Sequence, residues 1–138
     1  MNLHTNRRIE TSYPIEILIK PISEPDADWK KLGDGPGYFD IPDNMVAEIG
    51  IRNLNDETIK GLIEEIQDVE GLVSLNLSEN RNVGNKGLRF LPMLSQISHL
   101  NISACCLNDY GIDPIIKMGN LRALDLSYCT RLTDQSIK

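Results

Sequence analysis

A six-residue hydrophobic pattern occurs four times in this chain, and it constrains the fold more than any other feature. Each copy has apolar residues at its first, fourth and sixth positions, and the copies begin at residues 46, 72, 97 and 121. Successive copies are therefore 26, 25 and 24 residues apart. Near-constant spacing of this length indicates a repeat architecture, in which each unit packs mainly against its neighbours.

A second motif follows each copy at a nearly constant distance. Its third position is always Asp or Asn, at Asp56, Asn85, Asp109 and Asp134. These residue types are favoured helix N-caps, and apolar residues follow them at helical spacing. The first motif alternates as a strand does. Each repeat is therefore predicted to be a strand, a turn and a helix, and Pro92 and Pro114 should shorten or bend the second and third helices.

The fourth repeat resembles a known family. From Leu121 it has the leucine pattern through Leu126, followed by Ser127, a cysteine at Cys129, and Leu132. This stretch resembles the cysteine-containing leucine-rich repeat found in F-box proteins and related adaptors. The third repeat keeps the cysteine as Cys105, and the second has Asn80 in its place. The resemblance implies an α/β fold: a short solenoid of about four repeats over residues 45–138, with parallel strands on the concave face and helices outside.

Residues 1–44 differ in composition from the repeats. They contain five of the seven prolines and four of the seven aromatic residues. Residues 15–19 and 37–41 have the pattern of strands. The first repeat of a solenoid exposes an apolar end, so we expect this region to form a β-rich N-terminal cap, with a separate small domain as the alternative.

Charge and composition exclude several classes of function. The 14 Lys and Arg against 20 Asp and Glu give a net charge of −6, which opposes binding to nucleic acid or to anionic lipid. No apolar stretch is long enough to span a membrane, and no secretory signal is visible at the N-terminus. Three cysteines do not suggest a disulfide framework, so we expect reduced thiols and a cytoplasmic location.

Catalytic and metal sites are poorly supported. A nucleophilic thiol needs a nearby base, and His99 with Cys105 or Cys106 is the pairing that the sequence offers. The repeat register instead places Cys105 and Cys129 as small buried residues. Cys105 and Cys106 lack the spacing of a zinc site. We therefore expect no catalytic residue, no metal and no cofactor, and a cysteine-dependent enzyme remains the alternative.

The outward residues of successive strands are expected to align in columns. One column contains Glu48, Ser74, His99 and Ala123, the next Gly50, Asn76, Asn101 and Asp125, and the third Arg52, Ser78, Ser103 and Ser127. Such a polar face suits an extended peptide or a protein surface. The predicted binding residues are Glu48, Arg52, Asn76, Glu79, His99, Asn101, Asp125 and Tyr128.

The leading hypothesis is a non-catalytic interaction module or adaptor that binds a protein or peptide through its concave face. Recognition of substrates within a ubiquitin-ligase assembly is a further alternative, which only the family resemblance implies. The fourth repeat stops at Lys138 before its helix is complete. We therefore expect the strand of Leu124 and Leu126 to be an edge that self-association or another partner covers.

Overall fold

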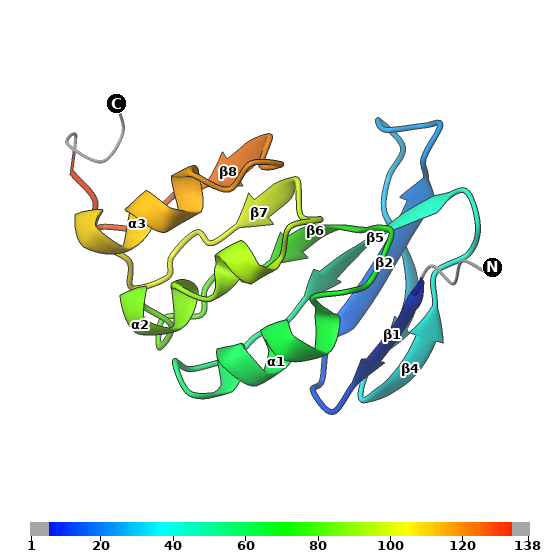
Figure 1. Cartoon of the computed structure of the whole chain (residues 1–138), viewed down its shortest axis with the longest axis horizontal. Helices are drawn as coiled ribbons and strands as arrows, with labels where there is room; N and C mark the ends of the chain where they lie inside the picture. The colour runs from blue at the N-terminus through cyan, green and yellow to red at the C-terminus, as the bar shows by residue number, and fades with distance from the viewer. Residues whose placement is uncertain (1–5, 134–138) are drawn as a thin grey trace.

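The structure of the protein is a computed structural model that describes residues 6–133. A six-stranded, mostly parallel sheet has helices along one face, so the fold is α/β (Figure 1). The order of its strands is β3-β2-β5-β6-β7-β8. Their bounds are β2 Glu16–Pro21, β3 Lys30–Asp34, β5 Met45–Gly50, β6 Leu72–Asn76, β7 His99–Asn101 and β8 Ala123–Asp125.

Strands β5 to β8 are parallel and adjacent in chain order. Their register confirms the first two predicted columns: Glu48 pairs with Ser74, Ser74 with His99 and His99 with Ala123, and the second column is Gly50, Asn76, Asn101 and Asp125. Between these positions the inward residues Ile49, Leu75 and Leu100 are buried. The outward side chains therefore share one face, opposite the helices.

A helix follows each of the first three parallel strands. These are α1 Thr58–Ile66, α2 Asn85–Leu88 and α3 Asp109–Ile116. The buried face of α1 consists of Ile59, Leu62, Ile63 and Ile66, which is the spacing that the sequence indicated. Pro92 lies in a 3₁₀ turn, η1 Leu91–Met93, that replaces the rest of the second helix, and Pro114 lies within α3.

The predicted helix N-caps are each wrong by one residue. The N-caps are Glu57, Gly84 and Asn108, whereas Asp56, Asn85 and Asp109 were expected. The side chains at the predicted positions point sideways and accept hydrogen bonds from the backbone of the next repeat. Asp56 Oδ1 accepts from the N–H groups of Gly84 and Gly87, both at 2.9 Å. The fourth predicted cap, Asp134, and the expected unfinished helix lie outside the described residues.

The link from Asp56 to Gly84 recurs further along the stack. Asn85 Oδ1 accepts from the backbone N–H of Asn108 at 3.1 Å, and Asp109 Oδ1 accepts from that of Thr133 at 2.8 Å. Each of these side chains binds the backbone N–H at the second position of the same motif in the following repeat. The third position of the motif therefore joins neighbouring repeats.

The turn that leaves each strand is also repeated. Asn53, Glu79, Ala104 and Tyr128 all have φ between +56° and +64°, in the left-handed region. In the last three repeats the next residue is buried and donates to a backbone carbonyl: Asn80 to Ile51 and Leu77, Cys105 to Leu77, and Cys129 to Ile102. The small buried role expected for the two cysteines is therefore confirmed.

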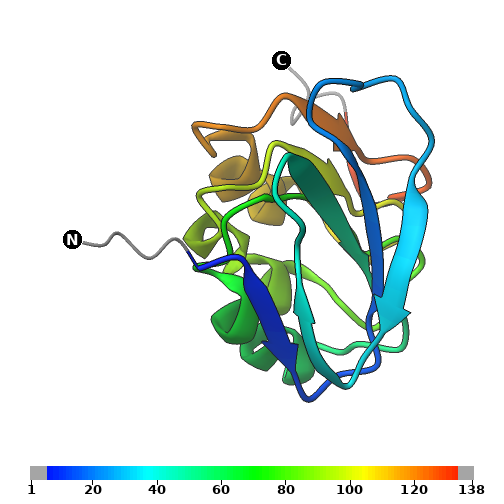
Figure 2. The same ribbon diagram turned by 90° about the vertical axis from the view of Figure 1, so that its right-hand side faces the viewer.

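Residues 6–44 contain four strands, of which two were foreseen. The predicted strands correspond to β2 and to β4 Gly37–Asp40, while β1 Arg8–Thr11 and β3 were not anticipated. Strand β1 pairs with β4, and β2 pairs antiparallel with both β3 and β5. In Figure 2 these blue and cyan strands stand in front of the green to orange repeats. Among the described residues, no helix is long and apolar enough to cross a membrane.

Candidate functional site

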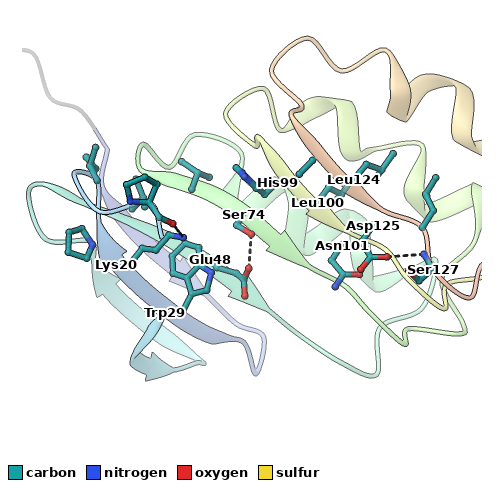
Figure 3. A pocket seen from close by; sticks show the side chains of 17 residues that line it. Lys20, Trp29, Glu48, Ser74, His99, Leu100, Asn101, Leu124, Asp125 and Ser127 are labelled. Atoms are coloured by element: carbon teal, nitrogen blue, oxygen red, sulfur yellow. Dashed lines mark hydrogen bonds between the residues drawn. The ribbon is translucent and has the colours of Figure 1, made fainter. Parts of the chain in front are cut away.

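A groove of about 650 Å³ lies on the outward strand face. The loop between β2 and β3 forms one wall, and the parallel strands form the floor and the opposite wall (Figure 3). The groove reaches from β5 to β8. Together with the loop wall, it is lined by residues more than one hundred positions apart in the sequence, such as Lys20 and Ser127.

The loop wall is mainly apolar. Pro21, Ile22, Pro25 and Trp29 line it, and the side chain of Ile22 is 55% exposed. Lys20 Nζ lies 4.4 Å from the centre of the Trp29 ring and donates to the carbonyl of Pro25 at 2.7 Å. Both contacts hold the ammonium group against its own loop.

The floor mixes polar and apolar side chains. Glu48 is half-buried, and its Oε1 accepts a 2.6 Å hydrogen bond from Ser74 Oγ of the neighbouring strand. Val46 and Val73 contribute apolar surface beside this pair. His99 is exposed, and its Nδ1 lies 2.8 Å from Ser98 Oγ. The Glu48 carboxylate is therefore oriented by Ser74 within the groove.

The polar side chains of the second column, which is Gly50, Asn76, Asn101 and Asp125, also stabilise the turns that follow the strands. The side-chain oxygen of Asn76, Asn101 or Asp125 accepts from the backbone N–H two residues later, at Ser78, Ser103 and Ser127, over 2.9 to 3.0 Å. Hydrogen bonds from Ser127 also hold the pKa of the Asp125 carboxyl below its usual value. One oxygen of each side chain is thus committed to the strand-leaving turn.

The eight predicted binding residues do not form a single site. Glu48, His99, Asn101 and Asp125 line the groove. Arg52 and Asn76 line a second hollow of about 470 Å³ beside the β3–β4 turn. Glu79 and Tyr128 are exposed residues of the left-handed turns, and Tyr128 borders a small hollow of about 140 Å³.

The loop wall was not predicted as part of the site. Its contact with the strand face depends on β2 pairing with β5, which no short-range pattern reveals. The concentration of proline and aromatic residues in residues 1–44 is the available signal, and on its own it indicates only a cap. Trp29 and Lys20 are the functional candidates that the sequence missed.

The cysteines are poorly suited to nucleophilic chemistry. Cys105 is 4% exposed, and burial raises the pKa of its thiol to about 12. Burial also raises the pKa of Cys129. A thiol with a raised pKa is protonated at neutral pH and is a weak nucleophile. Cys106 is exposed. Within residues 6–133, no cluster of three His, Cys, Asp or Glu side chains is suited to a metal ion.

The repeated strand, left-handed turn and helix define a class of repeat protein. Residues 72–91 and 119–138 match the family model described as "Leucine Rich repeat". The chain therefore contains leucine-rich repeats, in matched segments that begin at β6 and just before β8. No curated protein matches the chain.

Proposed function

We propose that this protein is a non-catalytic interaction module that binds an extended peptide, or an extended segment of a protein, in the groove of Figure 3. Leucine-rich repeats generally mediate protein–protein interactions and are generally not enzymes. The observation that carries the proposal is the groove itself, in which the polar strand face and the apolar loop wall meet.

The dimensions of the groove suit a peptide. A volume of about 650 Å³ lies within the usual range of ligand pockets, about 300–1,000 Å³. Adjacent strands are about 4.8 Å apart, so the distance from β5 to β8 is about 14 Å, the length of four or five extended residues. An extended peptide across the strands could therefore contact all four repeats.

The architecture that we propose is a solenoid of about four repeats, in which residues 1–44 form an N-terminal cap. In support, β2 covers the free side of β5, and Ile9, Ile15, Ile17 and Ile41 are buried in the same core as the repeat leucines. We also propose a cytoplasmic adaptor role, which the free state of all three cysteines favours.

A cysteine-dependent enzyme is less well supported. The Cys105 thiol donates to the carbonyl of Leu77, and its raised pKa keeps it protonated at neutral pH. His99 contacts Ser98, and its exposed ring lies on the outward face. These observations favour binding over thiol chemistry.

Strand β8 is one of the two edge strands of the six-stranded sheet and offers a second surface for association. We propose that self-association or a capping partner uses this edge, as unpaired strand edges commonly do. Sedimentation of the chain over a range of concentrations tests this, because an edge-paired dimer dissociates on dilution and a monomer does not change.

Selection of peptides tests the groove. A displayed library of random twelve-residue peptides is enriched on the protein, and the dissociation constants of the enriched peptides are measured by fluorescence polarisation. Ala123→Tyr adds bulk to an exposed position in the groove, and Lys117→Tyr adds the same group to an exposed position on the turn after α3. We expect Ala123→Tyr to weaken binding at least ten-fold and Lys117→Tyr to leave it unchanged. Equal binding to both variants would place the site elsewhere.

A further inference from the structure

We infer that the groove selects an extended peptide with two basic side chains four residues apart, which lie over Glu48 and Asp125. This inference rests on the proposed function, since it specifies the ligand of the same groove. It follows from the placement of charge in the groove, from the distance between the two carboxylates, and from the polar floor between them.

Negative charge is available in the groove, whereas its positive charge is already engaged. The charged residues of the lining are Lys20, Glu48 and Asp125. Lys20 lies over the Trp29 ring and donates to Pro25 in its own loop. Its ammonium group therefore cannot serve the two carboxylates without giving up these contacts.

Each carboxylate accepts hydrogen bonds from the protein. Glu48 Oε1 accepts from Ser74, and Asp125 accepts from the backbone N–H of Ser127 at Oδ1 and from the Ser127 side chain. These bonds orient the carboxylate groups, and each group keeps acceptor capacity for a ligand because a carboxylate offers about four lone-pair sites. A lysine or arginine that donates to a carboxylate oxygen forms a charge-assisted hydrogen bond, which is stronger than a neutral one.

The separation of the two positions sets the spacing of the basic residues. Glu48 lies on β5 and Asp125 on β8, three strand intervals away and two residues further along the strand direction. With about 4.8 Å between strands and about 3.3 Å per residue, the separation is about 16 Å. Side chains four residues apart on an extended peptide are on the same face and about 13 Å apart, and long basic side chains span the remainder.

A polar side chain fits between the two basic ones. Ser74, His99 and Asn101 line the floor between the carboxylates, on the two strands that separate Glu48 from Asp125. The residue midway between the basic ones faces the floor, because alternate side chains of an extended chain share a face. The preferred ligand is therefore basic, polar and basic at alternate positions.

Defined peptides test this inference. The first probe is a capped nonapeptide of threonine with lysine at its third and seventh positions, so that a polar threonine stands at its fifth. Three comparison peptides carry glutamine in place of both lysines, glutamate in place of both lysines, or the second lysine moved to the sixth position. Calorimetry measures each affinity, and the emission of Trp29, the only tryptophan of the chain, reports occupation of the groove.

We expect the lysine probe to bind at least ten-fold more tightly than the glutamine peptide, and the glutamate peptide not to bind. The peptide with the altered spacing should bind three-fold or more weakly than the lysine probe, because one of its lysines then points away from the floor. Glu48→Gln and Asp125→Asn should each weaken binding of the lysine probe about three- to ten-fold, because each removes the negative charge. Each amide keeps an oxygen that can accept the hydrogen bond from the protein itself. Glu64→Gln, an exposed charge on α1, should have no effect.

The outcomes separate this inference from the proposed function. If the glutamine peptide binds as tightly as the lysine probe and changes the Trp29 emission, the groove is a peptide site but the inference of basic ligands is wrong. If the altered spacing binds equally well, the two-site geometry is wrong. If none of the four peptides binds, the inference is overturned, and the library selection then decides whether the proposed function also fails.

Discussion

Residues of different chemistry fill the same position of successive repeats. Asn80, Cys105 and Cys129 each follow a left-handed residue, are buried, and donate to a carbonyl of the preceding turn or strand. Asn80 in addition accepts from the N–H of Leu54 at 2.8 Å. The position requires a small buried donor, and an amide satisfies more backbone groups than a thiol does.

Because of this difference, truncation of Asn80 should lower the free energy of unfolding more than truncation of Cys105. Asn80→Ala leaves the N–H of Leu54 and two carbonyls without their side-chain partner, and we expect it to lower the free energy of unfolding by about 2–4 kcal/mol. Cys105→Ala removes one weak donor and should cost about 1 kcal/mol. Urea denaturation followed by circular dichroism measures both. Equal costs would mean that the amide's extra hydrogen bonds do not contribute.

The thiols should differ sharply in reactivity. At pH 7.5 we expect iodoacetamide to modify Cys106 alone in the folded protein, because Cys105 and Cys129 are buried and their pKa values are raised. Mass spectrometry of the labelled protein locates the modified residue. His99→Ala should leave all three rates unchanged. Rapid labelling of Cys105 that slows in this variant would support the cysteine-enzyme alternative.

The same burial makes stability depend on pH in the alkaline range. The Cys105 thiol of the unfolded chain ionises with the ordinary thiol pKa of 9.0, whereas burial raises the pKa of the folded thiol to about 12. The unfolded state thus binds fewer protons between these values, so stability falls as pH rises. From pH 8 to 10.5 this group should lower the free energy of unfolding by about 2 kcal/mol, and the Cys105→Ala variant should not show this decrease. An identical loss in the two proteins, measured by denaturation, would contradict this.

At the scale of elements, polar side chains join neighbouring repeats. The sequence indicates which residues these are, but it does not indicate which backbone groups they bind. The local pattern predicts Asp56 and Asn85 as caps of their own helices, and they instead bind the backbone of the next repeat. A pattern of Asp or Asn before a helix does not distinguish these roles, because both use the same acceptor oxygen. Only the neighbouring repeat, which the local sequence does not contain, decides between them.

Close approach of repeats predicts a strict requirement for glycine at position 87. A Cβ atom there would lie 2.6 Å from Ile59 Cγ2 and 2.7 Å from Asp56 Oδ1, whereas a Cβ atom at Gly119 meets nothing within 4 Å. We expect Gly87→Ala to lower the free energy of unfolding by about 1–3 kcal/mol and Gly119→Ala to change it little. Thermal denaturation compares the two variants. A neutral Gly87→Ala would show that α2 can move away from α1 without cost.

The predictable and unpredictable parts of the fold have different physical origins. The parallel strands, the inward residues and the two outward columns follow from periodicity, which burial imposes on every repeat. Strand β1 has a single apolar residue among charged and polar ones, and β3 has three charged residues and a glycine, so pairing partners specify both strands more than their own sequences do. The loop wall of the groove depends on those pairings, and it therefore could not be predicted.

At the scale of the whole molecule, residues 6–44 are attached to the repeats by the pairing of β2 with β5, by a shared core and by side-chain contacts that include the Glu65 carboxylate. Glu65 on α1 accepts from Thr11 Oγ1 at 2.7 Å and from Ser12 Oγ at 2.8 Å, and its oxygens also lie 3.2 Å from the Ser12 N–H. The β1–β2 turn is thereby held on the first helix. This arrangement supports the proposed cap over a separate domain.

A cap predicts a single cooperative transition. Urea unfolding followed by Trp29 emission, which reports residues 6–44, should coincide with unfolding followed by far-ultraviolet circular dichroism. Glu65→Ala should shift both curves together by about 1–3 kcal/mol, and the neighbouring exposed residue provides a matched control in Glu64→Ala, with a shift below about 0.5 kcal/mol. Two separate transitions would indicate an independent domain.

The antiparallel pairing of β2 with β5 fixes one end of the groove. A further parallel repeat cannot be added on that side, because β2 already occupies the edge of β5. A longer face can therefore be built only beyond β8, in increments of about 4.8 Å, or about one and a half residues of extended ligand per repeat. Under the proposed function, the number of repeats beyond the Trp29 wall therefore sets the length of peptide that the groove can hold.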